Sequence, residues 1–311
     1  MTELLVGTKK GLFALEGEPG SPFEVAARAF AGEPVEYAMR DPRTGRVIAS
    51  VTSPFYGPKL WVVLFVSHDG GSSWELHRPF WEQPTRPDWQ PGGGGLCLHS
   101  IVPWPDDPDR LALAISAAGV WLSDDGGETW RHGNKGLRGD YLPEDAPEDT
   151  ITLCIHDLQR APLRPERLFM QFHGGVYRSD DAGESWIDIA EGLPSNFGFP
   201  LVVDPADPDS AYVIPLTGSE DRVTPQGRPR VWETRDAGAT WTERGDGLPA
   251  EHAYLTVLRQ AFDRAGSGDA LELYFGTTTG EVFGSGDAGA TWGPTAAHLP
   301  PVYSVRTTAA T

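Results

Sequence analysis

One eight-residue phrase occurs five times in this chain, as SHDGGSSW (67–74), SDDGGETW (123–130), SDDAGESW (179–186), TRDAGATW (234–241) and SGDAGATW (285–292). Its third-position aspartates, Asp69, Asp125, Asp181, Asp236 and Asp287, lie 51–56 residues apart. A fixed period of this length is typical of a protein built from copies of one supersecondary unit. In each copy the aspartate can accept hydrogen bonds from backbone N–H groups, the glycine allows a turn conformation that a Cβ would obstruct, and the Ser or Thr caps the turn. We therefore expect a hairpin turn at each copy, with the tryptophan starting the next strand.

These phrases resemble the Asp-box, or bacterial neuraminidase repeat. The chain is similar over nearly its whole length to the sialidase-like β-propellers that carry this repeat, in an uncharacterised branch that resembles glycosyl hydrolases. The resemblance implies that each box lies on the turn between the third and fourth strands of a blade, on the face away from the active site. The boxes therefore predict the fold and leave the chemistry open.

Between the boxes the sequence repeats four short β-rich segments, which is the strand content of one propeller blade. First strands are expected at 35–40, 98–104, 155–159, 199–204 and 254–260. A further blade is split between the chain ends, with 302–307 as its inner strand and 4–8, 11–15 and 23–27 as its other three; this pairing removes exposed sheet edges. We predict an all-β fold, a six-bladed β-propeller of four-stranded antiparallel blades that forms a single domain of residues 1–311. Seven blades is the alternative, if a long insertion at 82–95, 138–149 or 217–230 hides a degenerate blade.

Composition agrees with one soluble body, since 311 residues with 39% hydrophobic content can bury a large core, while 37 Gly and 28 Pro disfavour long helices. The net charge of −19, with 25 Lys and Arg against 44 Asp and Glu, argues against binding to nucleic acid. The opening MTELLVGT lacks the segments of a secretory signal, and no apolar run approaches the roughly 20 residues of a membrane span. We expect a cytoplasmic protein with no membrane attachment, in which Cys97 and Cys154 stay reduced.

The long insertions, including 53–59, all fall on the predicted face opposite the Asp-box turns. Functional loops concentrate where a rigid scaffold can aim them, so we place the site on this insertion-rich face, at the mouth of the central channel. Alignment of the first strands brings corresponding residues to that mouth: Glu36, His99, His156, Phe199, Tyr254 and Tyr303. His173, at the end of a second strand, adds a third imidazole.

Imidazole titrates near neutral pH and suits acid–base chemistry. Glu36, His99, His156 and His173 are therefore the predicted catalytic residues if the protein is an enzyme. The predicted ligand-binding residues are Tyr37, Asp157, Tyr254 and Tyr303. The alternative is that some of these histidines are core groups with satisfied hydrogen bonds.

Two neighbouring repeats share a smaller pattern, Cys97-Leu-His99 and Cys154-Ile-His156. Alternate residues of a strand point to the same side, so adjacent blades could bring thiols and imidazoles together. Both groups are ligands for zinc or copper. We predict His99, His156 and His173 as candidate ligands of such a metal, against the alternative that two copies of one repeat share a buried cysteine by descent.

Sialidase activity is not expected. The resemblance implies three arginines that clamp the substrate carboxylate, the first in a Phe-Arg-Ile-Pro type motif, and nothing before Ser67 matches it. Arg40, Arg160 and Arg306 lie on first strands but several residues past the channel mouth. If the protein is an enzyme, we expect a glycosidase-like hydrolase, although the sequence offers too many carboxylates to choose the pair that such an enzyme needs.

Two functions remain open. The first is a propeller that binds a small molecule or carbohydrate on the insertion-rich face and could also hydrolyse it. The second is a non-catalytic propeller that docks a protein or peptide on that face. A deep polar pocket containing the histidines favours the first, and a broad shallow surface favours the second.

Overall fold

The computed structural model describes residues 1–40, 45, 47–51, 64–67, 73, 75–91, 96–139, 141–143, 145–147 and 150–308. The chain divides into two compact units. We call Leu60–Ile189 the middle unit, and Met1–Lys59 together with Ala190–Thr311 the terminal unit. The described helices are the single turn α1 (Arg78–Trp81) and the short 3-10 segments η1 (Arg86–Asp88), η2 (Pro225–Gly227) and η3 (Gly268–Ala270). None of the described helices has the length and apolar character needed to cross a membrane.

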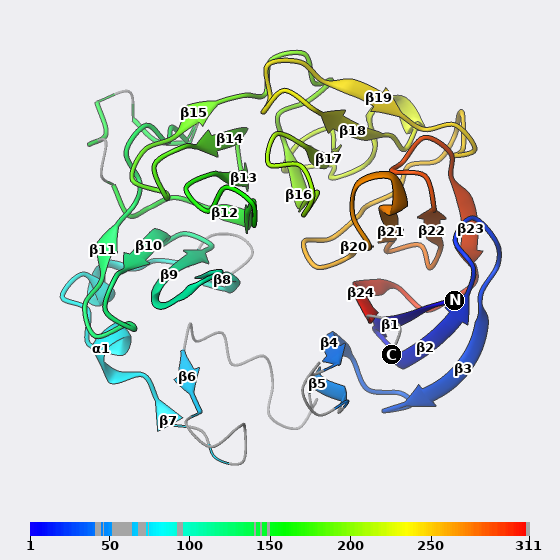
Figure 1. The fold of residues 1–311 in the computed structure, drawn as a ribbon, viewed down its shortest axis with the longest axis horizontal. Coiled ribbons are helices and arrows are strands. Elements are labelled where there is room, and N and C mark those ends of the chain that lie inside the picture. The colour runs from blue at the N-terminus through cyan, green and yellow to red at the C-terminus, as the bar shows by residue number, and fades with distance from the viewer. Residues whose placement is uncertain are drawn as a thin grey trace. The chain divides into compact units, whose positions relative to one another are not determined.

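The middle unit contains two four-stranded antiparallel sheets (Figure 1). The first is made of β8 (Leu98–Trp104), β9 (Asp107–Ile115), β10 (Gly119–Ser123) and β11 (Arg131–His132). The second is made of β12 (Ile155–Arg160), β13 (Leu168–Phe172), β14 (Gly175–Ser179) and β15 (Ile187–Asp188). A hairpin, β6 (Phe65–Val66) with β7 (Glu75–Leu76), precedes them. One apolar core joins the two larger sheets, because Leu122 of β10 packs in the same cluster as Met170 and Trp186 of the next sheet.

The terminal unit contains three such sheets and one hairpin. Two sheets are continuous in sequence: β16 (Gly198–Val203), β17 (Ala211–Pro215), β18 (Val231–Thr234) and β19 (Thr242–Arg244), then β20 (Phe262–Ala265), β21 (Glu272–Gly276), β22 (Val282–Ser285) and β23 (Gly293–Ala296). The third has the order β24 (Val302–Thr308), β1 (Thr2–Thr8), β2 (Gly11–Gly17) and β3 (Glu24–Ala29). The hairpin pairs β4 (Val35–Arg40) with β5 (Val47–Val51).

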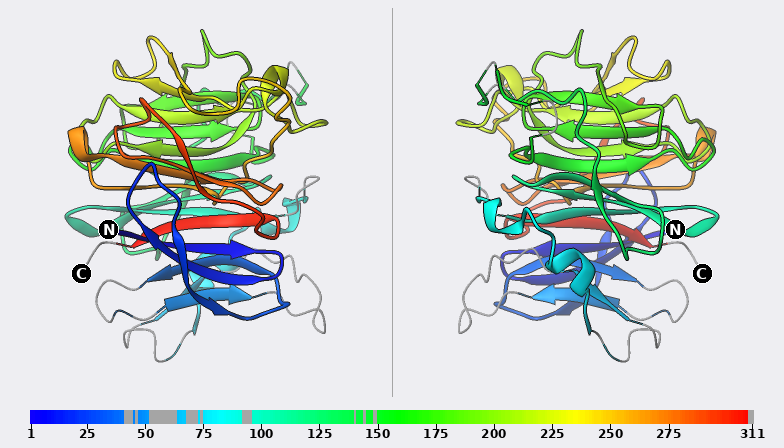
Figure 2. Two further views of the ribbon diagram at one scale, coloured as in Figure 1. Left: turned by 90° about the vertical axis from the view of Figure 1, so that its right-hand side faces the viewer. Right: turned by 90° about the vertical axis from the view of Figure 1, so that its left-hand side faces the viewer.

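The predicted blade split between the chain ends is confirmed. Strand β24 pairs antiparallel with β1, in a register that places Val6 opposite Val305, and the two strands run side by side in Figure 2. In chain order the hairpins β4–β5 and β6–β7 take the place of one further blade beside the five complete sheets. The fold class is therefore the predicted one, an all-β propeller fold with six blade positions. The single-domain organisation stays a prediction.

Each described Asp-box forms the same hydrogen-bond network. In the box at 179–186, Asp181 Oδ1 accepts from the backbone N–H of Ser185 at 2.9 Å and from the hydroxyl of Ser179 at 2.8 Å, while Asp181 Oδ2 accepts from the Ser185 hydroxyl at 2.5 Å. The Ser179 hydroxyl in turn accepts from the N–H of Gly183, whose φ of +97° lies in the region that favours glycine. The turn is thus held by side chains at most four residues away. The fourth strand starts just after the tryptophan rather than at it, and most of the first box lies outside the described residues.

The box tryptophan also joins neighbouring sheets of the middle unit. The indole N–H of Trp186 donates to the carbonyl of Gly133 at 2.8 Å, and the backbone N–H of Trp186 donates to the carbonyl of Lys135 at 2.9 Å. A Cβ at Gly136 would come within 2.4 Å of the Trp186 carbonyl oxygen, so the close approach requires glycine there. The box at 179–186 therefore closes its own turn and also binds the link that leaves the preceding sheet.

The predicted inner strands agree with β4, β8, β12, β16 and β24 to within one residue at each end. The prediction of an inner strand at 254–260 is wrong. The inner strand of that blade is β20, which begins at Phe262. The backbone of the expected segment instead bonds to the insertion at 217–230: Ala253 N–H donates to the Gly227 carbonyl at 2.8 Å, and the Leu255 carbonyl accepts from Thr224 N–H at 3.0 Å. Its β-forming side chains Leu255 and Val257 are buried in the core beneath that insertion.

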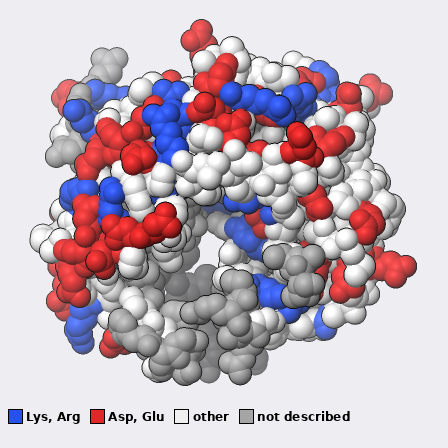
Figure 3. All heavy atoms as spheres, viewed as in Figure 1, with Lys and Arg blue, Asp and Glu red and all other residues white. Residues whose placement is uncertain are grey.

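Acidic and basic side chains are interspersed on the face shown in Figure 3, with net charge −19 for the whole chain. Several of these charges are paired within the described blades, as for Arg131 with Asp124 and Glu184, and for Glu233 with Arg235 and Arg244. The exposed pairs of Arg131 add little stability individually, whereas Glu233, which pairs with two arginines, is buried. The fold is carried by the apolar cores and the box turns.

Candidate functional site

The inner strands share a defect in their hydrogen-bond ladders. In four of them the pairing register shifts by one residue near the start of the strand, at Glu36 in β4, His99 in β8, His156 in β12 and Tyr303 in β24. Such a β-bulge re-aims a side chain and is common beside active sites. Four residues that the alignment of first strands made equivalent therefore occupy the same structural position. The bulges themselves were not predicted from the sequence.

In the second sheet of the middle unit, His156 and His173 lie at the end opposite the Asp-box. Phe172 of β13 pairs with both Ile155 and Gly175, next to the two histidines His156 and His173. At the other end of β13, Leu168 pairs with Ser179, the first residue of the box. The predicted separation of box and histidines holds within this sheet.

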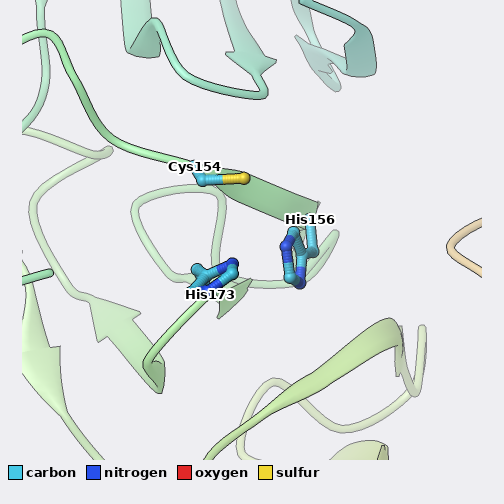
Figure 4. A group of neighbouring side chains, drawn as sticks. All are labelled: Cys154, His156 and His173. Atoms are coloured by element: carbon cyan, nitrogen blue, oxygen red, sulfur yellow. The ribbon is translucent and has the colours of Figure 1, made fainter. Parts of the chain in front are cut away.

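Three side chains meet at the start of β12 (Figure 4). Cys154 precedes the strand, His156 is its bulged residue and His173 follows β13. The two imidazole rings lie 5.3 Å apart between centroids with an interplanar angle of 70°. The Cys154 sulfur and a nitrogen of each ring all lie within 4.8 Å of one another. His156 is 1% exposed, whereas Cys154 and His173 are half-buried, so the group can be reached from one side.

Two further side chains support this group. The Ser116 hydroxyl lies 3.0 Å from the Cys154 sulfur, within hydrogen-bond distance. Tyr141 packs edge-on against His173 at 5.3 Å, and its hydroxyl accepts a hydrogen bond from the Cys154 N–H at 2.8 Å. Neither residue is among the site residues predicted from the sequence. Tyr141 lies in the long insertion at 138–149, where an aromatic residue was the available signal.

His99 and Asp157 belong to neighbouring inner strands, since β8 packs against β12. Asp157 Oδ1 accepts from the Ser100 hydroxyl at 3.2 Å and from the Leu158 N–H at 2.8 Å. Asp157 thus ties the strands that carry His99 and His156. Within the described part of the chain, the group close enough to hold an ion contains Cys154 where we had expected His99.

The remaining predicted residues belong to the terminal unit. Glu36 is exposed, and Tyr303 is half-buried; burial, together with the nearby Glu36 charge, raises the pKa of Tyr303. The Tyr37 hydroxyl accepts from Arg306 Nε at 3.2 Å, and the guanidinium lies 5.0 Å from the ring centroid. Tyr254 is 59% exposed in the segment before β20, not on the inner strand. The structure therefore groups Glu36 with Tyr303, and Tyr37 with Arg306.

The three arginines weighed for carboxylate binding make intramolecular contacts. Arg40 Nη2 bonds to both carboxylate oxygens of Glu3, at 2.6 and 2.8 Å. Arg160 donates to the Pro165 carbonyl and stacks 4.7 Å from the Trp104 ring centroid. Arg306 donates to Tyr37, as described above. Each guanidinium therefore contacts a residue of a neighbouring sheet: Glu3 of β1, Trp104 of β8 and Tyr37 of β4.

Comparisons with known proteins agree with this architecture. A family model described as BNR/Asp-box repeat matches residues 121–132. A xyloglucanase of Paenibacillus sp is 24% identical over 276 residues, covering 76% of this chain and 25% of the relative, so the chain spans about a quarter of that relative's length. Two solved structures superpose on this chain with a TM-score of 0.51. The GH74 xyloglucanase from Xanthomonas campestris is 17% identical, and the match covers 92% of this chain and 36% of that chain. The GH74 enzyme of Niastella koreensis is 15% identical, and the match covers 93% of this chain and 45% of that chain. At these identities the likeness concerns the fold alone.

Proposed function

Because this chain is a β-propeller protein with BNR/Asp-box repeats, we propose that it binds a small polar ligand of the carbohydrate class at the end of the middle unit where β12 begins. His156 and His173 would supply hydrogen bonds to sugar hydroxyls, and Tyr141 would supply a ring for stacking. A non-catalytic propeller that docks a protein or peptide is the alternative, as the sequence already left open.

The observation that carries the proposal is the pair of imidazoles 5.3 Å apart at the end of the sheet away from the Asp-box. Neutral imidazole has one donor and one acceptor, which matches the hydroxyl groups of a sugar. Tyr141 is 44% exposed beside them, and an amphipathic aromatic side chain of this kind is common in ligand sites. The name xyloglucanase, given to the Paenibacillus relative, points to xyloglucan oligosaccharides as the ligands to try first.

Binding is proposed ahead of hydrolysis. A glycosidase needs two carboxyl groups about 5–10 Å apart, one on each side of the scissile bond. In the described middle unit, Asp157 is the carboxylate next to His156 in the chain, but it is 7% exposed and already accepts hydrogen bonds from Ser100 and Leu158. Hydrolysis is therefore measured as a separate outcome.

The test is isothermal titration calorimetry of the whole chain with xyloglucan oligosaccharides, with a reducing-end assay run on the same mixtures. We expect saturable binding that weakens at least about 10-fold in His173→Ala, in line with the loss of one well-made hydrogen bond and its ring contact. His252→Ala is the matched control, since that imidazole is on the terminal unit with an 83% exposed side chain. Undiminished binding by His173→Ala would place the ligand elsewhere, and absence of any binding by folded protein would favour the docking alternative.

A further inference from the structure

We propose that Cys154, His156 and His173 form a binding site for one zinc ion. A thiolate and two neutral imidazoles are ligands that zinc prefers, and their ligand atoms already lie within 4.8 Å of one another. In a tetrahedral zinc site with bonds of 2.0–2.3 Å, neighbouring ligand atoms are about 3.5 Å apart. The group must therefore contract by only about 1 Å, which small χ rotations of three side chains can supply.

The backbone holds the three ligands in place. Cys154 and His173 face each other across the β12–β13 pair, and the His173 N–H donates to the Cys154 carbonyl at 3.1 Å. Residues in such a cross-strand pair project to the same face of the sheet. The third ligand, His156, lies at the bulge, where the shift in strand register re-aims the side chain. Two ligands are thus set by strand pairing and the third by the bulge.

The surroundings are those of a metal site in which outer residues orient the ligands. The Ser116 hydroxyl, 2% exposed and 3.0 Å from the Cys154 sulfur, can donate to the thiolate and stabilise its charge. Tyr141 packs on His173 and restricts rotation of that ring. The half-buried positions of Cys154 and His173 give an ion access.

Three protein ligands leave a fourth position of a tetrahedral zinc for water or another small molecule. This distinguishes the proposed site from a closed structural zinc centre with four protein ligands. The proposal does not depend on the carbohydrate proposal, because metal binding is measured on the protein without any sugar.

The neighbouring repeat supplies a matched control. Cys97 and His99 have the same Cys-x-His spacing, and His99 is likewise a bulged residue, but neither belongs to the group that meets around Cys154. Substitutions Cys97→Ser and His99→Gln therefore change the same residue types in the same setting. They separate loss of a ligand from a general effect of altering an inner strand.

The experiment treats the purified chain with chelator, removes the chelator, and titrates zinc and, separately, cobalt(II) as a spectroscopic substitute. We expect one zinc per chain by elemental analysis, and a near-ultraviolet thiolate-to-cobalt charge-transfer band. Cys154→Ser should lose that band, and His173→Gln should lose stoichiometric zinc, while Cys97→Ser and His99→Gln keep both. Circular dichroism of each variant in chelator verifies the fold.

Three results would overturn the proposal. The first is the absence of stoichiometric zinc in folded wild-type protein. The second is an unchanged cobalt band in Cys154→Ser. The third is equal loss of zinc in Cys97→Ser, which would assign the metal to a different ligand set. If Cys154→Ser does not fold, His173→Gln, whose residue lies outside the strands, decides the question.

Discussion

The hydroxyl of Ser100 donates a hydrogen bond to Asp157, and each of these residues directly follows a histidine, His99 in β8 and His156 in β12. The Leu158 N–H donates to the same two side chains, at 3.0 Å to Ser100 Oγ and 2.8 Å to Asp157 Oδ1. A small polar network thus joins two neighbouring inner strands immediately beside their bulged histidines. It fixes strand β12, which carries the proposed zinc ligand His156 and directly follows Cys154, although neither Ser100 nor Asp157 is itself a ligand.

Replacement of Ser100 by alanine should lower the free energy of unfolding by about 1–2 kcal/mol, because a buried carboxylate loses a donor. It should also weaken zinc binding by about 10-fold, as expected for a residue that positions a ligand. Urea unfolding and zinc titration measure the two effects. Ser210→Ala is the control, since Ser210 is 3% exposed and donates to Asp207 in the terminal unit, so it should lose similar stability with unchanged zinc affinity. Equal zinc affinities in both variants would show that the Ser100–Asp157 contact has no part in the site.

Removal of the box carboxylate in Asp181→Ala should cost about 2 kcal/mol of unfolding free energy, because the Ser185 N–H and two hydroxyls lose their common acceptor. Glu128→Ala, which removes an exposed carboxylate from another box, should change stability by less than about 0.5 kcal/mol. Denaturant titration of the three proteins provides the comparison. Similar curves for both variants would mean that the box network adds nothing to stability.

A glycine with a positive φ precedes a leucine in the links at Gly136 and Gly192, with φ values of +89° and +92°. Gly136→Ala should cost about 3–4 kcal/mol, since backbone strain is joined by a collision with the Trp186 carbonyl, 2.4 Å from the added Cβ. Gly192→Ala should cost about 1–2 kcal/mol from strain alone, because no heavy atom of the described residues lies within 4 Å of its Cβ. Thermal and denaturant unfolding test the order. A Gly192→Ala variant as unstable as Gly136→Ala would contradict the role given to Trp186.

The Asp-boxes should make stability depend on pH in the acid range. Hydrogen bonds from Thr129 and Thr240 lower the pKa of Asp125 and Asp236 below the ordinary value of 3.8. Burial opposes the same effect at Asp181 and Asp287, but hydrogen bonds from the box Ser or Thr outweigh it and lower those pKa values too.

Because these pKa values are lower in the folded state, the unfolded chain binds more protons than the folded chain as the pH falls below about 4. The boxes therefore stabilise the fold above the unfolded pKa, and this stabilisation is lost as the pH falls through the folded pKa. Unfolding free energies measured at neutral pH, at about pH 4 and at about pH 3 should decline on the acid side, with a shallower decline in Asp181→Asn. A steeper decline in that variant would reverse the assigned sign.

Local features were predictable from the sequence. The inner strands at 98–104 and 35–40 match β8 and β4 because alternating apolar residues between turn-forming residues are a local signal. The segment 254–260 carries the same signal, but a long-range contact with Gly227 and Thr224 uses its backbone groups. The prediction of a strand there failed because tertiary hydrogen bonds override β-propensity in this segment.

The candidate site was predictable only in part. His156 and His173 were expected together at the channel mouth, one at the start of a first strand and one at the end of a second strand, and the structure brings their rings together. Tyr141 was not expected, since a loop residue reaches the site by a path that periodicity does not describe. Tyr254 was placed on an inner strand that does not exist at that position.

The sequence by itself determined the repeat period, the Asp-box turns, the all-β class and the pairing of the two chain ends. These features depend on contacts within a few residues or on the repetition of one unit, as when Asp181 bonds to residues at most four positions away. Only the tertiary structure decided that Cys154 joins His156 and His173 where His99 had been expected. Strand register and the bulges at the inner strands set the directions of these side chains, and both arise from packing between strands rather than from any one strand's own residues.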